Sequence, residues 1–481
     1  MTASLSPLER ALGQLEATLD QHLDDLAALV RIGGISAEPP PNPTLQRSAE
    51  AVVALMTRAG LHQARVLELP GAHPYAYAEW LGAPGAPTLL LYGHHDVQPV
   101  GREAKWVTPP FEPDVREGRM YGRGAVDDKA GVMMHIAACA AWLDATGSLP
   151  VNVKFVVEGE EEIGSGNLER FLETHAELLA ADCIVLTDTA NLDAGIPSLT
   201  VSLRGLAAVT VEVRALRQPV HSGMWGGPLP DPVIALSRAL GELMDDDGQV
   251  MAPLRAGVAE LTPFEHAALA RLPYEEGDFR SQAGLVSGAT LIGRQDVPLY
   301  ARIWRQPAVA VIAFESRAIK GSSNQIIDSA RARVSVRTVP NQDSKVVQDA
   351  LVKHFETRVP FGLDVHLEAE RYARLEVHIE REEVASSWLT SAEGPAFDAA
   401  RRAMSAGYGR ECEIIGCGGT IPFVGPFARV LGGVPALLTG VEDPLCHAHS
   451  ENESLLIDDW KKGTRAAVRL YAELSTALTP R

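Results

Sequence analysis

Side chains of the types that bind metal ions follow apolar segments at several places in the chain. The first segment is LLLYGHHDVQP, where an apolar run leads into His94, His95 and Asp96. The second is GRGAVDDKAG, in which Asp127 and Asp128 lie between a glycine-rich turn and an apolar stretch. Each group taken alone would be an ordinary polar turn or the polar start of a helix. However, imidazole and carboxylate groups without thiolates are also ligands that zinc, manganese and cobalt accept.

Three further segments carry the same side-chain types. VVEGEEEIGS contains four glutamates within five positions, namely Glu158, Glu160, Glu161 and Glu162. CIVLTDTANL contains Asp188, and CHAHSENE, near the end of the chain, contains His447 and His449. Crowded carboxylates at the end of a buried strand cost free energy unless a cation lies among them. Many carboxylates with few histidines predict two ions that share a bridging carboxylate, about 3.5–4 Å apart.

The elements that would position these residues alternate between strands and helices. Residues 88–93 (TLLLYG), 151–158 (VNVKFVVE) and 183–188 (CIVLTD) have the composition of buried strands, and residues 130–143 that of a buried helix. This order predicts an α/β fold with a mostly parallel sheet covered by helices. Ligands of such sheets collect outside the carboxyl ends of the strands, which is where these segments place His, Asp and Glu.

The pattern changes near residue 197 and returns near residue 388. Between them, apolar and polar residues alternate in LTVSLRGLAAVTVEVRA, ARARVSVRTV and FGLDVHLEAE. Such alternation is typical of antiparallel strands with one solvent-exposed face. We therefore expect an inserted α+β domain over residues 197–378. Residues 1–196 and 379–481 would then form one discontinuous domain that carries the metal-binding residues.

Composition excludes several classes of protein. The 481 residues are 46% hydrophobic, enough for a full core, and carry a formal net charge of −19. A basic surface for nucleic acid or an anionic membrane is therefore not expected, and no apolar run approaches the length of a membrane span. The five cysteines form no C-x-x-C pair, which argues against a disulfide framework and a thiolate zinc site. The N-terminus lacks the pattern of a signal peptide, so we expect a reduced, cytoplasmic setting.

The chain resembles the co-catalytic zinc metallopeptidases, a family that includes carnosinases and other cytosolic dipeptidases, aminoacylases and carboxypeptidase G. The resemblance spans essentially the whole chain and rests on the motifs GHHDVQP, GRGAVDDKAG, EGEEEIGS, TDT, HSG, GGTIP and AHSENE. It implies two divalent ions, with zinc preferred over manganese or cobalt. The implied ligands are His94, Asp127 and Asp188 for the first ion, and Asp127, Glu162 and His449 for the second, with Asp127 as the bridge.

The same resemblance implies the chemistry. A hydroxide held by the two ions would attack the scissile peptide bond, with Glu161 as the general base. Asp96 would be a catalytic residue that orients His94 from outside the metal shell. The Asp127–Asp128 peptide bond is expected to be cis. Glu158 and Glu160 receive no metal role.

Substrate-binding roles also follow from the resemblance. His221, in PVHSGMWGG, matches a histidine that reaches the active site of the partner subunit, so the inserted domain is expected to serve as a lid and dimerisation domain in a homodimer. Arg337 matches an arginine that pairs with the carboxylate of a small peptide substrate, a task that suits a bidentate guanidinium. The remaining expected substrate contacts are Asn324, Gly419 and Thr420.

Three features favour the dipeptidase branch of this family over the deacylases. The first motif reads DVQP where deacylases tend toward DVVP, Asp188 stands where deacylases tend to have glutamate, and the inserted domain is longer than a deacylase lid. The predicted activity is therefore metal-dependent hydrolysis of dipeptides or short peptides. One alternative is a deacylase or desuccinylase that acts on N-acyl amino acids with the same metal core. The other is a non-catalytic binding homologue, against which the presence of every expected ligand and of Glu161 counts.

Overall fold

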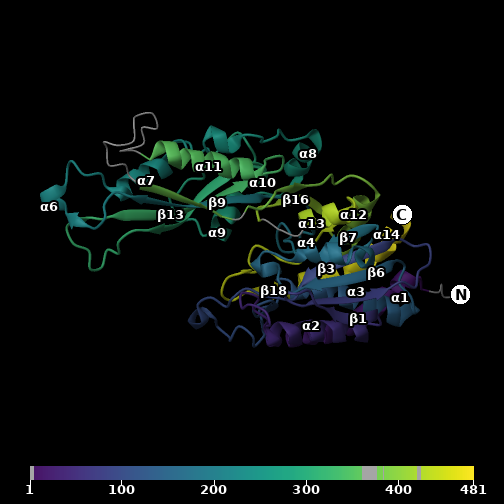
Figure 1. The fold of residues 1–481 in the computed structure, drawn as a ribbon. Coiled ribbons are helices and arrows are strands. Elements are labelled where there is room, and N and C mark those ends of the chain that lie inside the picture. Colours follow the sequence, from purple (N-terminus) through teal and green to yellow (C-terminus); the bar gives the residue numbers. More distant parts are fainter. Residues whose placement is uncertain (1–4, 360–375, 383, 420–423, 481) are drawn as a thin grey trace.

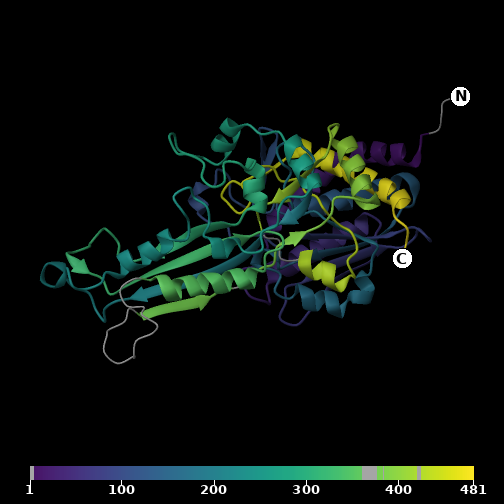
Figure 2. The same ribbon diagram turned by 90° about the horizontal axis from the view of Figure 1, so that it is seen from above.

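A broad body and an elongated extension make up the molecule (Figure 1). The computed structural model describes residues 5–359, 376–382, 384–419 and 424–480. The first and last described segments of the chain lie in the body, and the middle of the chain forms the extension, as the colours along the ribbon show (Figure 2). Among the described residues, no helix is long and apolar enough to cross a membrane.

A nine-stranded sheet forms the centre of the body. Its order is β1-β2-β6-β3-β7-β17-β8-β15, with β16 also paired to β8. The strands are β1 (His62–Leu67), β2 (Tyr75–Trp80), β3 (Thr88–His94), β6 (Asn152–Glu158), β7 (Cys183–Leu186), β8 (Ser198–Leu203), β15 (Trp388–Leu389), β16 (Glu413–Cys417) and β17 (Ala436–Leu438). The central strands β6, β3, β7 and β17 are parallel, whereas β1, β2 and β15 pair antiparallel at the flanks. The predicted α/β class is confirmed.

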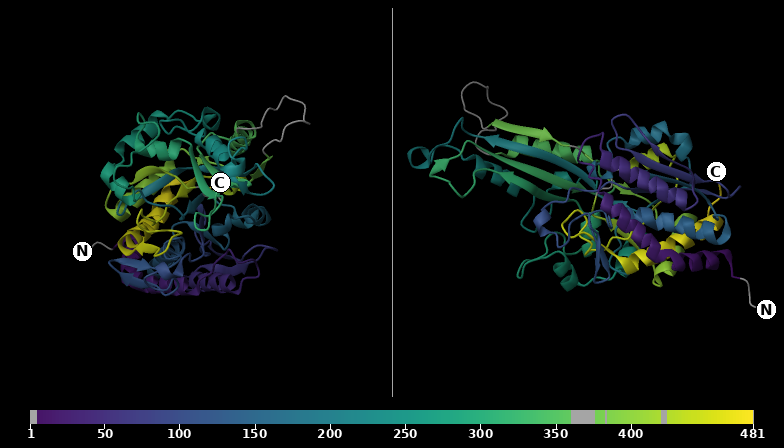
Figure 3. Two further views of the ribbon diagram at one scale, coloured as in Figure 1. Left: turned by 90° about the vertical axis from the view of Figure 1, so that its left-hand side faces the viewer. Right: turned by 90° about the horizontal axis from the view of Figure 1, so that it is seen from below.

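Helices cover both faces of this sheet. One face carries α1 (Pro7–Ile32), α2 (Pro43–Arg58), α3 (Lys129–Thr146), α12 (Pro395–Tyr408) and α14 (Ile457–Ala477), and the other carries α4 (Leu168–Thr174), α5 (Ala176–Leu179) and α13 (Val424–Val430). Figure 3 shows α1 and α2, in purple, on the lower face of the body. Successive residues of β3 enter opposite cores, Leu89 and Leu91 on one side and Leu90 and Tyr92 on the other. Burial on both faces explains the continuous apolar run of this strand.

The extension is built on a four-stranded antiparallel sheet. Its order is β11 (Ala308–Glu315), β13 (Ser329–Thr338), β9 (Gly205–Arg214) and β14 (Glu376–Arg381). Helices α7 (Pro232–Gly241) and α11 (Ser344–Arg358) bury one face of this sheet. The tip holds the short pair β10 (Val220–His221) and β12 (Gln325–Ile326), followed after β10 by α6 (Ser222–Trp225).

The remaining elements are short helices, strands and turns outside the two main sheets. They are β4 (Asp114–Arg116), β5 (Arg119–Tyr121), β18 (Ser454–Leu456), α8 (Pro263–Arg271), α9 (Glu276–Gln282), α10 (Leu299–Arg305) and the 3-10 turns η1 (Glu103–Lys105), η2 (Glu161–Ile163) and η3 (Ala252–Arg255). Strands β18, β5 and β4 form a small sheet of their own. Trp304 of α10 packs with Ile415 of β16, so part of the middle segment lies against the body.

The chain passes from the large sheet to the small one within two residues. β8 belongs to the large sheet although its residues fall in the predicted inserted range, and β9 begins at Gly205, after Arg204. On the return, Trp388 of β15 pairs with Leu203 of β8. β8 alternates polar and apolar residues as β9 does, yet all six of its residues are buried, and it pairs antiparallel with β15 and β17 and parallel with β16. The division into domains at residues 197 and 378 stays a prediction.

Candidate metal centre

The carboxyl ends of two neighbouring parallel strands bring His94 and Asp188 together. His94 is the last residue of β3, and Asp188 follows the end of β7 by two residues. Tyr92 of β3 lies opposite Leu186 of β7, so both strands end at the same level of the sheet. As a result, His94 Nε2 lies 3.9 Å from Asp188 Oδ1.

Asp127 completes a first group of candidate metal ligands. Its Oδ1 lies 3.0 Å from His94 Nε2. The ligand atoms of His94, Asp127 and Asp188 all lie within 4.8 Å of one another. One imidazole nitrogen and two carboxylates at such separations match the donors that a divalent ion of the zinc type accepts.

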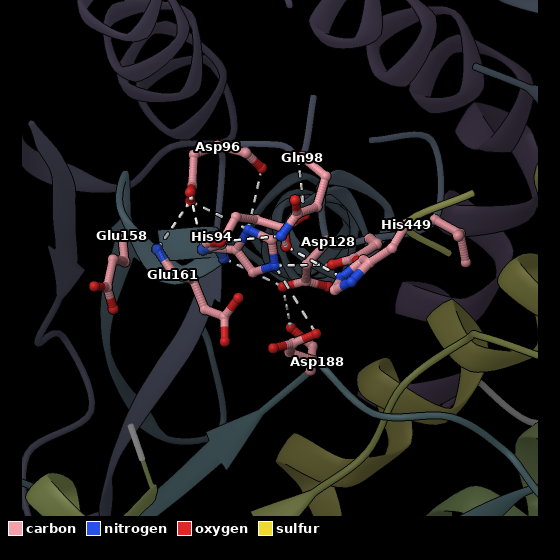
Figure 4. Close-up of polar contacts among 12 residues, drawn as sticks. His94, Asp96, Gln98, Asp128, Glu158, Glu161, Asp188 and His449 are labelled. Carbon is pink, nitrogen blue, oxygen red and sulfur yellow. Dashed lines mark hydrogen bonds and ion pairs between the residues drawn. The ribbon is translucent and has the colours of Figure 1, made fainter. Parts of the chain in front are cut away.

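Asp127 also belongs to a second group, together with Glu162 and His449. Its Oδ2 lies 2.9 Å from His449 Nε2, and that nitrogen lies 3.1 Å from Glu162 Oε2. The ligand atoms of this group also lie within 4.8 Å of one another. His94 therefore contacts one oxygen of Asp127 and His449 contacts the other. Figure 4 shows the two histidines on either side of the cluster. Each oxygen of Asp127 faces one group, as a carboxylate shared between two ions requires.

The turn before α3 fixes the position of Asp127. The peptide bond between Asp127 and Asp128 is cis, so this expectation is confirmed. Asp128 belongs to neither ligand group; its Oδ2 instead accepts the backbone N–H of His94 at 3.2 Å. Helix α3 follows directly and is buried from Lys129 to Trp142. A helix enclosed in this way holds its first turn, and hence Asp127, in a fixed place.

Asp96 connects His94 to the glutamate turn η2. Its Oδ1 lies 3.3 Å from His94 Nδ1, the ring nitrogen on the side away from Asp127. The backbone N–H of Glu161 donates to Asp96 Oδ1 at 3.2 Å, and that of Glu162 donates to Oδ2 at 3.0 Å. Burial alone would raise the pKa of Asp96, but His94 holds it below its usual value. One carboxylate therefore orients a histidine and two neighbouring glutamates.

Gln98 holds Glu162 in place and was not predicted as a site residue. Its backbone N–H donates to Glu162 Oε1 at 3.1 Å, and its side-chain amide donates to Glu162 Oε2 at 2.9 Å. The same amide donates to the backbone oxygen of Glu162 at 3.0 Å. The only signal in the sequence was an amide side chain four residues after His94, within DVQP.

Negative charge dominates the electrostatics of the site. Burial and the carboxylate of Asp127 raise the pKa of Glu162 to about 7. Burial and the nearby Asp188 raise the pKa of Glu161 well above its usual value. Hydrogen bonds to Asp127 and Glu162 raise the pKa of His449 to about 11. All three shifts favour added positive charge, which divalent cations would supply. The donor set therefore fits the predicted ions.

Glu158 and Glu160 lie outside both ligand groups. Glu158 Oε2 accepts a hydrogen bond from the hydroxyl of Tyr92 at 2.6 Å, at the edge of the cluster in Figure 4. Burial raises the pKa of Glu158 to about 8. Glu160 accepts the backbone N–H groups of His73 at 3.1 Å and Asn167 at 2.8 Å. Both side chains therefore anchor the loop that carries Glu161 and Glu162.

The sequence model of a known family matches most of the chain. It is the model of peptidase family M20/M25/M40, and the match covers residues 90–473. The chain belongs to peptidase family M20/M25/M40. The predicted family and the predicted class, a hydrolase that cleaves peptide bonds with metal ions, are confirmed.

Relatives of this M20/M25/M40 peptidase carry the names of dipeptidases. The cysteinylglycine-S-conjugate dipeptidase of Corynebacterium striatum is 33% identical over 77% of this chain and 77% of its own length. The Cys-Gly metallodipeptidase of Schizosaccharomyces pombe is 30% identical over 98% of this chain and 99% of its own length. Human carnosine dipeptidase 1 superimposes with a TM-score of 0.81 at 26% identity, covering 98% of this chain and 99% of that one. The predicted dipeptidase branch is confirmed.

Two of the expected substrate contacts of this M20/M25/M40 peptidase lie at the tip of the extension. His221 pairs with Gln325 between β10 and β12, and Asn324 O accepts the backbone N–H of Ser222 at 2.9 Å. Helix α6, which follows His221, lies at the end of the extension farthest from β3 (Figure 1). Within one chain, therefore, His221 and Asn324 are close to each other but remote from the ligand groups.

Two other expected contacts lie where the extension meets the body. Arg337 pairs with Leu206 at the start of β9. Arg204 donates its backbone N–H to Gly419 O at 3.2 Å. Burial and the proximity of Arg337 lower the pKa of Arg204 to about 10, so two guanidinium groups lie near the Gly419 loop. Arg204 was not predicted as a site residue. Thr420 lies outside the described residues.

Proposed function

We propose that this M20/M25/M40 peptidase hydrolyses the peptide bond of dipeptides or short peptides with two divalent metal ions. The observation that carries the proposal is the position of Asp127, whose two oxygens face two separate ligand groups. The relatives named as dipeptidases, which match 77% and 98% of the chain, support the substrate class.

The ligand groups define the proposed metal sites. His94 and Asp188 would hold one ion with Asp127, and Glu162 and His449 would hold the other with the same Asp127. Two bound ions supply an acidified water and polarise the scissile carbonyl. Zinc is the proposed ion because imidazole and carboxylate ligands suit it, and manganese or cobalt would fit the same donors.

Glu161 is the proposed general base. It neighbours the ligand Glu162 but belongs to neither group, so its carboxylate is available to take a proton. Asp96 fixes the backbone N–H of Glu161 and thereby the position of this side chain. A raised pKa suits a group that takes a proton from water and returns it to the leaving amine near neutral pH.

A homodimer is proposed because the extension presents an apolar edge. Strand β11 is the edge strand of its sheet, and Val311, Ile312 and Phe314 are 47%, 54% and 43% exposed. Exposed apolar edge strands favour pairing with another chain. In such a dimer His221, with Asn324 beside it, would act at the site of the partner subunit.

The body side of the substrate site is proposed to recognise the substrate's carboxylate. Arg337 would form a bidentate pair with that carboxylate, and Gly419 would offer a backbone contact. Thr420, next to Gly419, is proposed as a further contact on the strength of the sequence alone. A cytoplasmic location is proposed as well, consistent with the free thiols of the described cysteines.

The activity is tested with two substrate panels, one of free dipeptides and one of N-acetyl and N-succinyl amino acids. The enzyme is stripped with a chelator, refilled with zinc or manganese, and assayed for released amino acids. Asp127→Asn serves as the control because it alters the carboxylate common to both ligand groups. Metal-dependent cleavage of dipeptides supports the proposal. Cleavage of acylated amino acids alone would replace it with a deacylase, and inactivity on both panels would replace it with a binding role.

A further inference from the structure

The turn that carries His449 has an unusual backbone. His447, His449 and Asn452 have φ values of 56°, 62° and 62°, in the left-handed region that few non-glycine residues adopt, although Asn, Asp and His do so more often than the others. Such conformations cost free energy and persist only where surrounding contacts impose them. Contacts from elsewhere in the chain must therefore hold this turn in the shape that aims His449 at Asp127.

Two residues of the turn form hydrogen bonds with the loop after β3. Glu451 accepts hydrogen bonds from the guanidinium of Arg102 at 2.8 and 3.0 Å. Asn452 Oδ1 accepts the backbone N–H of Val107 at 2.8 Å, and its Nδ2 donates to Lys105 O at 2.9 Å. Arg102 and Val107 are exposed, so these contacts hold the solvent-facing side of the turn.

The next residue, Glu453, forms a buried ion pair with Arg123. Arg123 Nη1 donates to Glu453 Oε2 at 2.7 Å, and the two side chains are 1% and 0% exposed. The other oxygen, Oε1, accepts the backbone N–H groups of Val126 at 3.1 Å and Asp127 at 3.3 Å. Glu453 therefore connects the histidine turn directly to the main chain of the shared ligand Asp127.

The second terminal nitrogen of Arg123 reaches two other segments. Nη2 donates to Ser450 O at 3.1 Å, directly after His449, and to Pro99 O at 3.2 Å. Pro99 follows Gln98, whose backbone and side chain donate to the carboxylate of Glu162. The guanidinium of Arg123 thus fixes Ser450, which is adjacent to the proposed ligand His449. It also fixes Pro99, which is adjacent to the Gln98 that holds Glu162.

A buried ion pair of this kind is weak evidence for stability, because desolvation offsets most of the attraction between the two charges. Its geometric effect is stronger, since the planar fork of arginine fixes several acceptors at once and lysine cannot reproduce it. Within the described part of the chain, neither side chain bonds to His94, to Asp188 or to a residue adjacent to them.

We infer that Arg123 and Glu453 are positioning residues for the second metal site, made by Asp127, Glu162 and His449. Arg123 acts on the His449 and Glu162 sides of that site, and Glu453 acts on Asp127. The inference rests on the proposed pair of ions, and two-ion binding by the unaltered protein tests that pair separately. Loss of a residue that orients metal ligands lowers metal affinity by about 10- to 100-fold.

The test is zinc titration of the chelated protein by calorimetry, with a competing chelator for the tighter site. Arg123→Lys keeps the buried charge and lacks the fork, so we expect about 10- to 100-fold weaker binding of one ion and an unchanged affinity for the other. Glu453→Gln should weaken the binding of the same ion. Because Glu453 also holds the backbone of Asp127, this variant should weaken the binding of the other ion to a smaller degree. Excess zinc should restore kcat in Arg123→Lys, because its ligands and base are intact.

Arg119→Lys is the matched control. Arg119 also reaches the C-terminal segment, donating to Asp443 Oδ2 at 2.6 Å and to Ser454 Oγ at 2.8 Å. Within the part of the chain that the structure describes, it donates to no residue adjacent to a proposed ligand. It should bind both ions as the unaltered protein does. The inference would be overturned if Arg123→Lys lowered the zinc affinity of both sites equally. It would also be overturned if the chelated variant unfolded at a lower thermal midpoint than the chelated control, because either result would show a general structural role. Unchanged binding of both ions would overturn it too.

Discussion

Replacement of Glu161 by glutamine should abolish most activity without loss of metal. Glutamine has nearly the same shape but cannot take a proton. The backbone N–H that donates to Asp96 at 3.2 Å stays in place, so the turn that carries Glu162 keeps its anchor. Glu161 belongs to neither ligand group, so both groups stay complete.

The expected loss follows from the task of the residue. A positioned general base contributes about 10²- to 10⁴-fold to the rate. This corresponds to about 3–5 kcal/mol of barrier, at about 1.4 kcal/mol per tenfold. Since the carboxylate acts on the reacting water rather than on the bound substrate, the loss should lie in kcat with little change in KM.

The assay compares Glu161→Gln with Glu162→Gln, its direct neighbour. Both are dialysed against zinc, and their metal content is measured by atomic emission beside kcat and KM on a dipeptide. Glu161→Gln should hold as much metal as the unaltered protein, whereas Glu162→Gln should lose one ion, because it lacks a ligand carboxylate. Equal metal content in both variants with activity retained in Glu161→Gln would refute the assignment of the base.

Three further predictions concern other parts of the molecule. His221→Ala and Glu161→Ala subunits, each inactive alone, should recover activity when mixed as dimers, because one site then has both residues; a verified mixed dimer without activity would contradict action across the interface. Arg337→Lys should raise KM for dipeptides by about 10-fold or more, since a bidentate charged hydrogen bond is worth about 1.5–3 kcal/mol; dipeptide amides, which lack the carboxylate, should be unaffected. Burial lowers the pKa of His135 to about 3, so below pH 6.5 the unfolded chain gains a proton that the folded chain does not. The free energy of unfolding of the chelated protein should therefore lose about 2 kcal/mol between pH 7 and pH 5 from this residue, and urea titrations of His135→Gln should lack that loss.

The positions of His94, Asp127 and Asp188 among the proposed metal ligands were predictable because each lies beside a local pattern. An apolar run ends at His94, another precedes Asp188, and a buried helix begins after Asp128. Parallel neighbouring strands then bring their carboxyl ends together without further information. The residues that orient the ligands were not predictable in this way. Arg123 and Glu453 are separated by 330 positions and meet only through the complete fold.

The path of the chain between the two sheets could not be predicted from the sequence pattern either. β8 and β9 have similar alternating residues, yet one joins the large sheet and the other the small one. Alternation usually indicates a strand with one less buried face, as in β9, but both faces of β8 are buried, so the pattern did not separate the two strands. The location of His221 at the tip likewise depends on the length of β9 and β13, which no single motif encodes.

Leu203 of β8 lies opposite Trp388 of β15, so the middle segment leaves and re-enters the body at one point. Two chain ends at that spacing can be joined by a short turn or by a folded unit of any size. The ligand-bearing body and the extension can therefore be inherited as separate modules, and evolution can exchange one without rebuilding the other. An exchanged extension would bring a different residue to the position of His221 while every ligand of the body stays in place. The contact of Trp304 with Ile415 restricts such exchanges to extensions that cover the same apolar patch on β16.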